Sequence, residues 1–185
     1  YLIKEYFANY FLHMSDVTFN MKNNEMEVHD KRAENWRVTL VDTGSHTMTG
    51  GRLKRVREFL KEEENFCFTY GDGVGNINIT DSINYHLTHK KLATMTATYA
   101  PGRFGALDIE NGKIKSFQEK PKGDGAMING GFFVLNKKVI DYIESDETLW
   151  EEEPLTNLAN DGQLMAFEHK DFWQPMDTIR DKMIL

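Results

Sequence analysis

Hydrophobic and polar positions along this chain follow two periods, one typical of strands and one typical of helices. Residues 16–21 and 92–99 alternate at every second position, which predicts strands, whereas Ile79–His89 has helical spacing. Segments of the two kinds follow one another along the chain, and this order favours an α/β fold. Further strands are predicted over residues 36–41, 66–72, 128–135 and 164–168, a hairpin over 106–118, and helices from residue 49, after 135 and after 177.

The apolar run that begins at Phe66 stops abruptly at Gly71-Asp72-Gly73. A glycine on each side of Asp72 lets the backbone turn sharply and lets a bulky ligand approach. A carboxylate at the end of a buried strand lies where open α/β sheets bind ligands, and its oxygens suit Mg²⁺. A plain hairpin turn is the alternative, because Asp-Gly is a common turn dipeptide.

Composition limits the classes of partner. The 185 residues fit one domain over 1–185, and their net charge of -7 argues against nucleic acid or an anionic membrane surface. Anionic small molecules stay possible, because a local basic cluster acts within about 8–10 Å. Cys67 is the single cysteine, which indicates a cytoplasmic protein without internal disulfides, and its apolar surroundings predict a buried thiol. No apolar run is long enough to predict a membrane span.

Two further segments could bind anions or sugars. The helix predicted from residue 49 begins among hydroxyls and glycines, so free N–H groups together with Arg52 could bind an anion; alternatively, Thr49 is only an N-cap. Where a later strand ends, Glu119 could accept bonds from sugar hydroxyls and Lys120 could bind a phosphate; alternatively, they form an exposed ion pair.

Three other positions have two interpretations each. Asn129-Gly130-Gly131 interrupts an apolar strand, which indicates either a bulge or close approach of a ligand. Asp177 is either a second metal ligand or the N-cap of the last helix. His86 and His89 have no third metal ligand at suitable spacing, so a solvated helix face is expected.

Taken in order, these segments resemble the sugar-nucleotide pyrophosphorylases, most of all the members that form CDP-glucose. The resemblance extends over nearly the whole chain, and its seven segments are residues 40–44, 49–55, 70–74, 101–107, 117–125, 127–133 and 172–178. It implies a Rossmann-like mixed β-sheet flanked by helices. It also implies a homo-oligomer whose product supplies CDP-linked sugars for bacterial surface polysaccharides such as the lipopolysaccharide O-antigen.

The same resemblance assigns roles to individual residues. The implied reaction joins CTP and α-D-glucose 1-phosphate to give CDP-glucose and pyrophosphate, with Mg²⁺ as cofactor. Catalysis would depend on Asp72, Lys120 and Asp177, of which the two aspartates would bind Mg²⁺. The CTP site would contain Thr47, Arg52 and Gly71. The glucose 1-phosphate site would contain Gly105, Glu119, Lys120, Asn129 and Gly130.

One departure from the family pattern matters for activity. The family begins with a strand and a glycine-rich, arginine-bearing loop, and neither pattern occurs here, so we expect a domain that is incomplete at both termini. A chain without that loop should turn over CTP poorly or not at all. A non-catalytic sugar-phosphate-binding or assembly module, a pyrophosphorylase for another nucleotide, and a glycosyltransferase are the alternatives.

Overall fold

The computed structural model describes residues 1–30, 34–102, 106–110, 113–118 and 126–185. Contacts divide the chain into two compact units, Tyr1–Asp42 and Thr43–Leu185, and each is described by itself. The single domain expected over residues 1–185 stays a prediction. None of the helices in the described residues is both long and apolar enough to cross a membrane.

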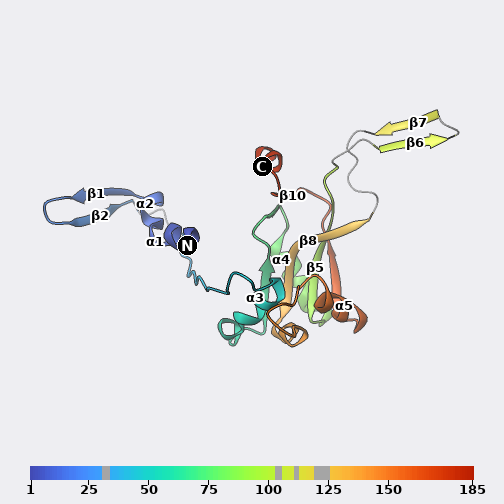
Figure 1. Ribbon diagram of the computed structural model, residues 1–185, viewed down its shortest axis with the longest axis horizontal. Helices are drawn as coiled ribbons and strands as arrows, with labels where there is room; N and C mark the ends of the chain where they lie inside the picture. The colour runs from blue at the N-terminus through green and yellow to red at the C-terminus, as the bar shows by residue number, and fades with distance from the viewer. Residues whose placement is uncertain (31–33, 103–105, 111–112, 119–125) are drawn as a thin grey trace. The chain divides into compact units, whose positions relative to one another are not determined.

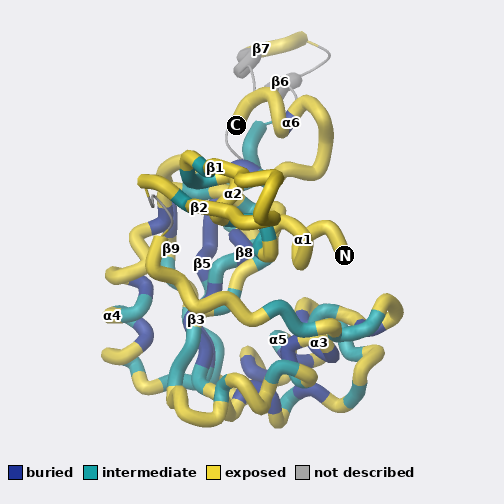
Figure 2. Tube along the Cα trace, turned by 90° about the vertical axis from the view of Figure 1, so that its left-hand side faces the viewer, coloured by how far each residue is buried: buried dark blue, intermediate teal, exposed yellow. Residues whose placement is uncertain are grey.

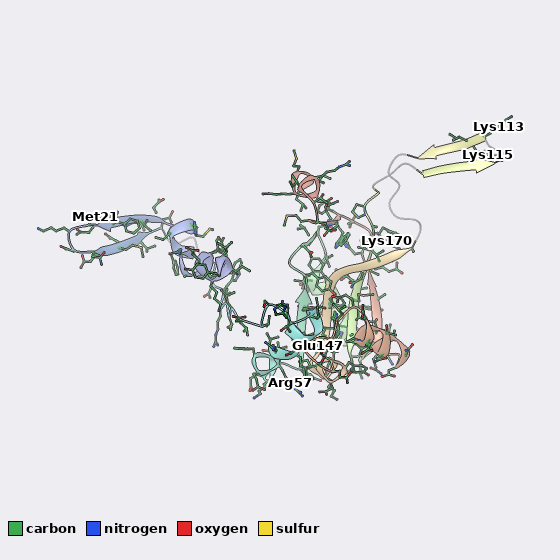
Figure 3. All side chains as sticks on the ribbon, in the orientation of Figure 1. Met21, Arg57, Lys113, Lys115, Glu147 and Lys170 are labelled. Atoms are coloured by element: carbon green, nitrogen blue, oxygen red, sulfur yellow. The ribbon has the colours of Figure 1, made fainter. Side chains whose placement is uncertain are left out.

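The first unit contains two short helices and a hairpin. The helices are α1 (Leu2–Ala8) and α2 (Tyr10–Met14), and the antiparallel strands are β1 (Asp16–Asn20) and β2 (Glu25–His29). The strand expected over residues 16–21 is therefore confirmed. Met21, in the turn between the strands, is 87% exposed and points away from the hairpin (Figure 3).

The strand expected over residues 36–41 is wrong. This segment has no regular secondary structure, and Trp36 and Val38 are exposed. A strand needs a neighbouring backbone for its hydrogen bonds, and no described strand pairs with these residues. Alternating apolar residues alone could not reveal that the partner is missing.

The second unit is built on a four-stranded mixed sheet with the order β3-β8-β5-β9, in which β8 and β5 are central (Figure 1). The strand β8 is antiparallel to both of its neighbours, and β5 is parallel to β9. These strands are β3 (Asn65–Thr69), β5 (Ala93–Tyr99), β8 (Met127–Asn136) and β9 (Leu164–Glu168). The expected α/β architecture, a mixed sheet with helices against it, is confirmed.

Shorter elements complete this unit. Two antiparallel pairs lie outside the main sheet: β4 (Gly73–Gly75) with β10 (Trp173–Pro175), and β6 (Ala106–Glu110) with β7 (Lys113–Gln118). The second pair confirms the hairpin expected over residues 106–118. The helices are α3 (Thr49–Arg55), α4 (Ile79–His89), α5 (Glu153–Asn160) and α6 (Ile179–Ile184), with 3-10 helices η1 (Arg57–Leu60) and η2 (Lys137–Tyr142).

Buried residues gather along β5 and β8 (Figure 2). On one face of the sheet, Phe133 and Leu135 of β8 belong to an apolar core with Trp150, Leu158 of α5 and Leu53 of α3. The opposite face carries Thr94, Thr96 and Thr98 of β5, all nearly inaccessible to solvent, and α4 packs against it. Because β5 is buried on both faces, it can tolerate little change in side-chain volume.

Cys67 was expected to be buried, and the structure shows that it is exposed. Its strand, β3, is at the edge of the sheet, and alternate residues of that strand face solvent. The aromatic residues on either side of Cys67 pack inward. Because the whole segment is apolar in sequence, it resembles a central strand.

Candidate functional site

Pairing of β4 with β10 brings together the backbones of two aspartates that are far apart in sequence. Gly73 pairs with Pro175, and the Met176 N–H donates to the Asp72 carbonyl over 2.8 Å. Asp177 follows directly, so its backbone lies beside that of Asp72. Both aspartates are exposed and therefore accessible to a ligand.

Asp177 is not the N-cap of α6, so that interpretation is wrong. The cap is Thr178, whose hydroxyl accepts a bond from the Asp181 N–H over 3.2 Å while the Asp181 carboxylate accepts one from the Thr178 N–H. This reciprocal arrangement is a capping box. Helix capping therefore does not explain an aspartate at position 177.

The chemistry of this donor set suits Mg²⁺. Among the described residues there is no group of three or more His, Cys, Asp and Glu that could hold a metal. Mg²⁺ does not need such a cage, because it is usually bound by one or two carboxylates, substrate phosphates and water. Asp72 and Asp177 thus fit an ion that arrives with a phosphorylated substrate.

The glycine pair of β8 lies next to these strands. The Trp173 indole N–H of β10 donates to the Gly130 carbonyl over 2.8 Å, and a Cβ built on Gly73 would be 3.7 Å from the same oxygen. The ladder between β5 and β8 shifts register here, which agrees with the first of the two interpretations, a bulge. The Asn129 side chain accepts the Gly131 N–H over 2.8 Å. Asn129 and Gly130 are therefore placed in the same region as Asp72.

Tyr70 is a member of this region that the sequence did not single out. Its N–H donates to the Gly131 carbonyl, and its ring packs against Phe133. Burial raises the pKa of the Tyr70 phenol, and the nearby Glu151 carboxylate raises it further. An aromatic residue in a strand is ordinarily part of the core, so its position next to Gly71-Asp72 was the only available signal.

At the start of α3 the structure contradicts the expectation of free N–H groups. The N–H of Met48 donates to the Asp146 carbonyl over 2.8 Å, and that of Gly50 donates to the Thr148 carbonyl over 3.0 Å. The glycines are needed for this packing, since a Cβ on Gly51 would lie 2.3 Å from the Asp146 carbonyl oxygen. The helix start therefore docks onto a loop of the same chain.

The two α3-region residues assigned to CTP have different environments. Thr47 is buried, whereas Arg52 is exposed and donates to the Thr43 hydroxyl over 2.6 Å. Thr49 is not an N-cap either, because Met48 has that position. The Thr49 hydroxyl donates to the Glu151 carboxylate over 2.6 Å. No hydrogen bond or ion pair between described residues joins Thr47 or Arg52 to Asp72.

Three predicted site residues, Gly105, Glu119 and Lys120, lie outside the described residues. Gly71 is described and exposed, directly before Asp72. The structure therefore brings together five of the predicted positions: Gly71, Asp72, Asn129, Gly130 and Asp177.

A cavity of about 270 Å³ adjoins β10 and contains Trp173, Phe172 and Tyr99 in its wall. Lys170 also lines it and forms an ion pair of 3.0 Å with Glu168. Ligand pockets commonly combine such aromatic surfaces with a few polar groups. This cavity lies along the same strand that leads to Asp177.

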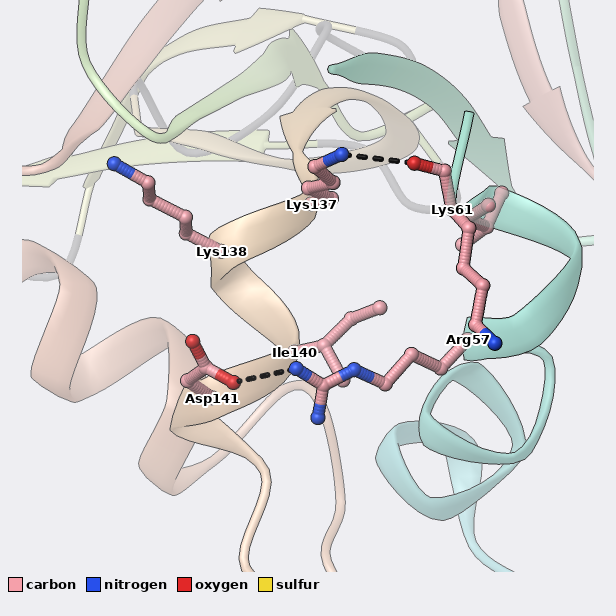
Figure 4. A pocket seen from close by; sticks show the side chains of 7 residues that line it. Arg57, Lys61, Lys137, Lys138, Ile140 and Asp141 are labelled. Atoms are coloured by element: carbon pink, nitrogen blue, oxygen red, sulfur yellow. Dashed lines mark hydrogen bonds and ion pairs between the residues drawn. The ribbon is translucent and has the colours of Figure 1, made fainter. Parts of the chain in front are cut away.

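A larger cavity, of about 350 Å³, lies between η1 and η2 (Figure 4). Its wall is basic, but three of its cations already have partners: Arg57 pairs with Asp141 at 3.3 Å, Lys61 pairs with Glu58, and the Lys137 ammonium donates to the Lys61 carbonyl over 2.8 Å. None of the predicted site residues lines it. The larger cavity is therefore separate from the site at Asp72 and Asp177.

The histidines of α4 do not form the solvated face that was expected. His86 is only 2% exposed, and its ring nitrogens lie 2.9 Å from the Thr94 hydroxyl and 3.2 Å from the Asn65 side-chain oxygen. His89 contacts the same hydroxyl at 2.6 Å. These contacts join α4 to the sheet, and they explain the histidines without a metal.

Comparisons with known proteins agree with this arrangement. Residues 3–178 match the model of the family described as Nucleotidyl transferase. Over all 185 residues the chain is 69% identical to the glucose-1-phosphate cytidylyltransferase of Salmonella typhi and covers 72% of that protein. It is 30% identical to the mannose-1-phosphate guanyltransferase beta-B of Xenopus laevis, with 91% of this chain and 47% of that protein covered.

A solved structure supports the fold. The crystal structure of HddC from Yersinia pseudotuberculosis superposes with a TM-score of 0.56 at 23% identity. The match covers 75% of this chain and 60% of the HddC chain.

Proposed function

This chain belongs to the nucleotidyl transferase family, and from that premise we propose that its protein is a glucose-1-phosphate cytidylyltransferase, which makes CDP-glucose and pyrophosphate from CTP and α-D-glucose 1-phosphate. The observation that carries this proposal is the 69% identity that extends over the entire chain. The exposed residues Asp72 and Asp177, whose backbones lie side by side, support it from the geometry.

The reaction is an in-line displacement at phosphorus. A phosphate oxygen of glucose 1-phosphate attacks the α-phosphorus of CTP, and the bond from that phosphorus to the bridging oxygen of pyrophosphate breaks. Such a reaction needs two anions to be aligned and their charge reduced, with little covalent help from the protein. The mechanism needs no side-chain nucleophile, and it therefore assigns no role to Cys67, the exposed thiol of β3.

Asp72 and Asp177 would hold Mg²⁺, which when bound offsets the negative charge of the CTP phosphates. Thr47, Arg52 and Gly71 are proposed to contact CTP, and Lys120 to fix the phosphate of glucose 1-phosphate as a point charge. Asn129, Gly130, Gly105 and Glu119 would orient the sugar. The proposal extends to a cytoplasmic homo-oligomer whose product enters bacterial surface polysaccharides.

Pyrophosphate release by the complete protein tests the proposal. With glucose 1-phosphate and Mg²⁺ present, CTP should give rapid release and UTP, GTP or dTTP much less. Asp72→Asn should reduce kcat/KM by at least about 100-fold, because one of two cation ligands is lost. Release with a different nucleotide would favour a pyrophosphorylase of other base preference, and no release with any nucleotide would favour the non-catalytic module.

A further inference from the structure

The carboxylate of Asp181 is buried although it belongs to a short and otherwise exposed helix. Asp181 is 6% exposed, whereas every other residue of α6 is exposed. A buried carboxylate is costly unless several donors compensate for the lost water. The structure must therefore supply those donors.

Three donors from two elements bind this carboxylate. One oxygen accepts bonds from the Thr178 N–H at 3.0 Å and the Thr178 hydroxyl at 2.7 Å. The other oxygen accepts a bond from the Gln174 side-chain amide at 2.9 Å. Gln174 is itself only 7% exposed. The bonds to Thr178 form the helix cap, but the bond from Gln174 has no role in capping and joins β10 to α6.

Asp177 lies inside the loop that this bond closes. Before Asp177, strand pairing and the bond from the Met176 N–H to the Asp72 carbonyl hold the backbone. After it, the capping box fixes Thr178. The backbone of Asp177 is therefore held on both sides. The bond from Gln174 to Asp181 joins the ends of the segment 174–181 that contains these two fixed residues.

We infer that Asp181 and Gln174 are positioning residues that keep Asp177 beside Asp72, so that both carboxylates can bind one divalent cation. This inference rests on the proposed function, which makes the two exposed aspartates cation ligands. Both oxygens of Asp181 accept bonds from the chain, and its role is therefore to orient and not to bind the ion. Partners that orient metal ligands in this way typically change metal affinity by about 10- to 100-fold.

Binding of Mn²⁺ to the complete protein tests this inference. The fraction bound is measured from the electron paramagnetic resonance signal of the unbound ion. Asp177→Asn should remove most of the binding. Asp181→Asn and Gln174→Leu should each weaken it by about 10-fold. In the Asp177→Asn background, Asp181→Asn should cause no further loss. Lys182→Gly, which weakens the same helix at an exposed position, serves as the control and should bind Mn²⁺ like the unaltered protein.

Each contrary outcome has its own meaning. Unchanged Mn²⁺ binding by Asp177→Asn would overturn the metal site of the proposed function. A loss in Asp177→Asn, combined with unaltered binding in Asp181→Asn and Gln174→Leu, would overturn the positioning role alone. An equal loss in Lys182→Gly would show that any weakening of α6 has the same effect, and would also overturn it. If Asp181→Asn does not fold, Gln174→Leu gives the answer, because it retains the helix cap.

Discussion

Gly131 shows how one residue can decide the shape of the region around Asp72. Its backbone has a φ of +76°, and a Cβ at this position would lie 2.7 Å from the Tyr70 ring. Two separate requirements therefore exclude a side chain: the left-handed backbone and the close approach of Tyr70. Gly162 has a similar φ of +63°, but a Cβ there would meet nothing within 4 Å.

The two glycines allow these requirements to be measured separately. Gly162→Ala should lower the free energy of unfolding by about 1–2 kcal/mol, the cost of a left-handed conformation for alanine. Gly131→Ala should cost about 1–3 kcal/mol more, because the methyl group also displaces the Tyr70 ring. Urea unfolding of both variants provides the comparison. Equal losses would mean that the ring moves aside without cost.

Hydrogen-bond directions can be assigned along the network that joins α4 to the sheet. The Lys91 N–H donates to Nδ1 of His89 over 2.9 Å, so a neutral His89 carries its proton on Nε2 and donates to the Thr94 hydroxyl. That hydroxyl can then donate to Nδ1 of His86, whose Nε2–H donates to the Asn65 side-chain oxygen. Every partner is satisfied only when both rings are neutral.

The free energy of unfolding should therefore depend on pH through the histidines that join α4 to the sheet. Burial lowers the pKa of both His86 and His89, and Lys91 lowers that of His89 further. An unfolded histidine binds its proton near pH 6.5. Below that pH the unfolded chain binds more protons than the folded chain, so stability is complete above pH 6.5 and decreases as the pH falls.

The expected slope is at most about 1.4 kcal/mol per pH unit for each histidine. Thermal unfolding between pH 7.5 and 5.5 measures it. His86→Gln should flatten the pH profile, whereas His46→Gln, at an exposed position, should leave its slope unchanged. Identical slopes in all three proteins would exclude the network as the source.

At the scale of the whole molecule, the last described stretch of the first unit is an accessible segment of backbone. Residues 34–42 have no regular secondary structure, and Trp36 is 63% exposed. Limited digestion should therefore cut here first, with trypsin after Arg37 and chymotrypsin after Trp36. Phe132 and Phe133 in β8 should resist chymotrypsin. Early cleavage in β8, detected by mass spectrometry of the fragments, would contradict this division of the chain.

Sequence patterns predicted the sheet better than they predicted the environments of single residues. Residues 92–99 and Ile79–His89 have strong periodicity, and both elements were confirmed. Residues 36–41 and Cys67 were misjudged because pairing and edge position depend on other strands. The environment of His86 could not be predicted, since its partners Thr94 and Asn65 come from two different strands.

The candidate site shows the same limit. The turn at Asp72 suggested a ligand site, but only the pairing of β4 with β10 shows that Asp177 lies beside it. The prediction of free N–H groups at α3 was wrong, because their acceptors, the carbonyls of Asp146 and Thr148, come from a loop nearly a hundred residues later. Contacts over such separations leave no periodic signal in a single sequence.

The order of the strands in the main sheet also has a consequence for folding kinetics. Asn65 pairs with Asn136, and Ala93 pairs with Leu164, so each of these pairs joins residues 71 positions apart. Contacts between distant segments slow folding, because a long loop must close before any stabilising contact forms. During synthesis β5 has no neighbouring strand until β8 leaves the ribosome. Its hydrogen-bonding edges are therefore exposed for the time in which more than thirty further residues are added, and in that interval a chaperone would have most effect on the yield of folded protein.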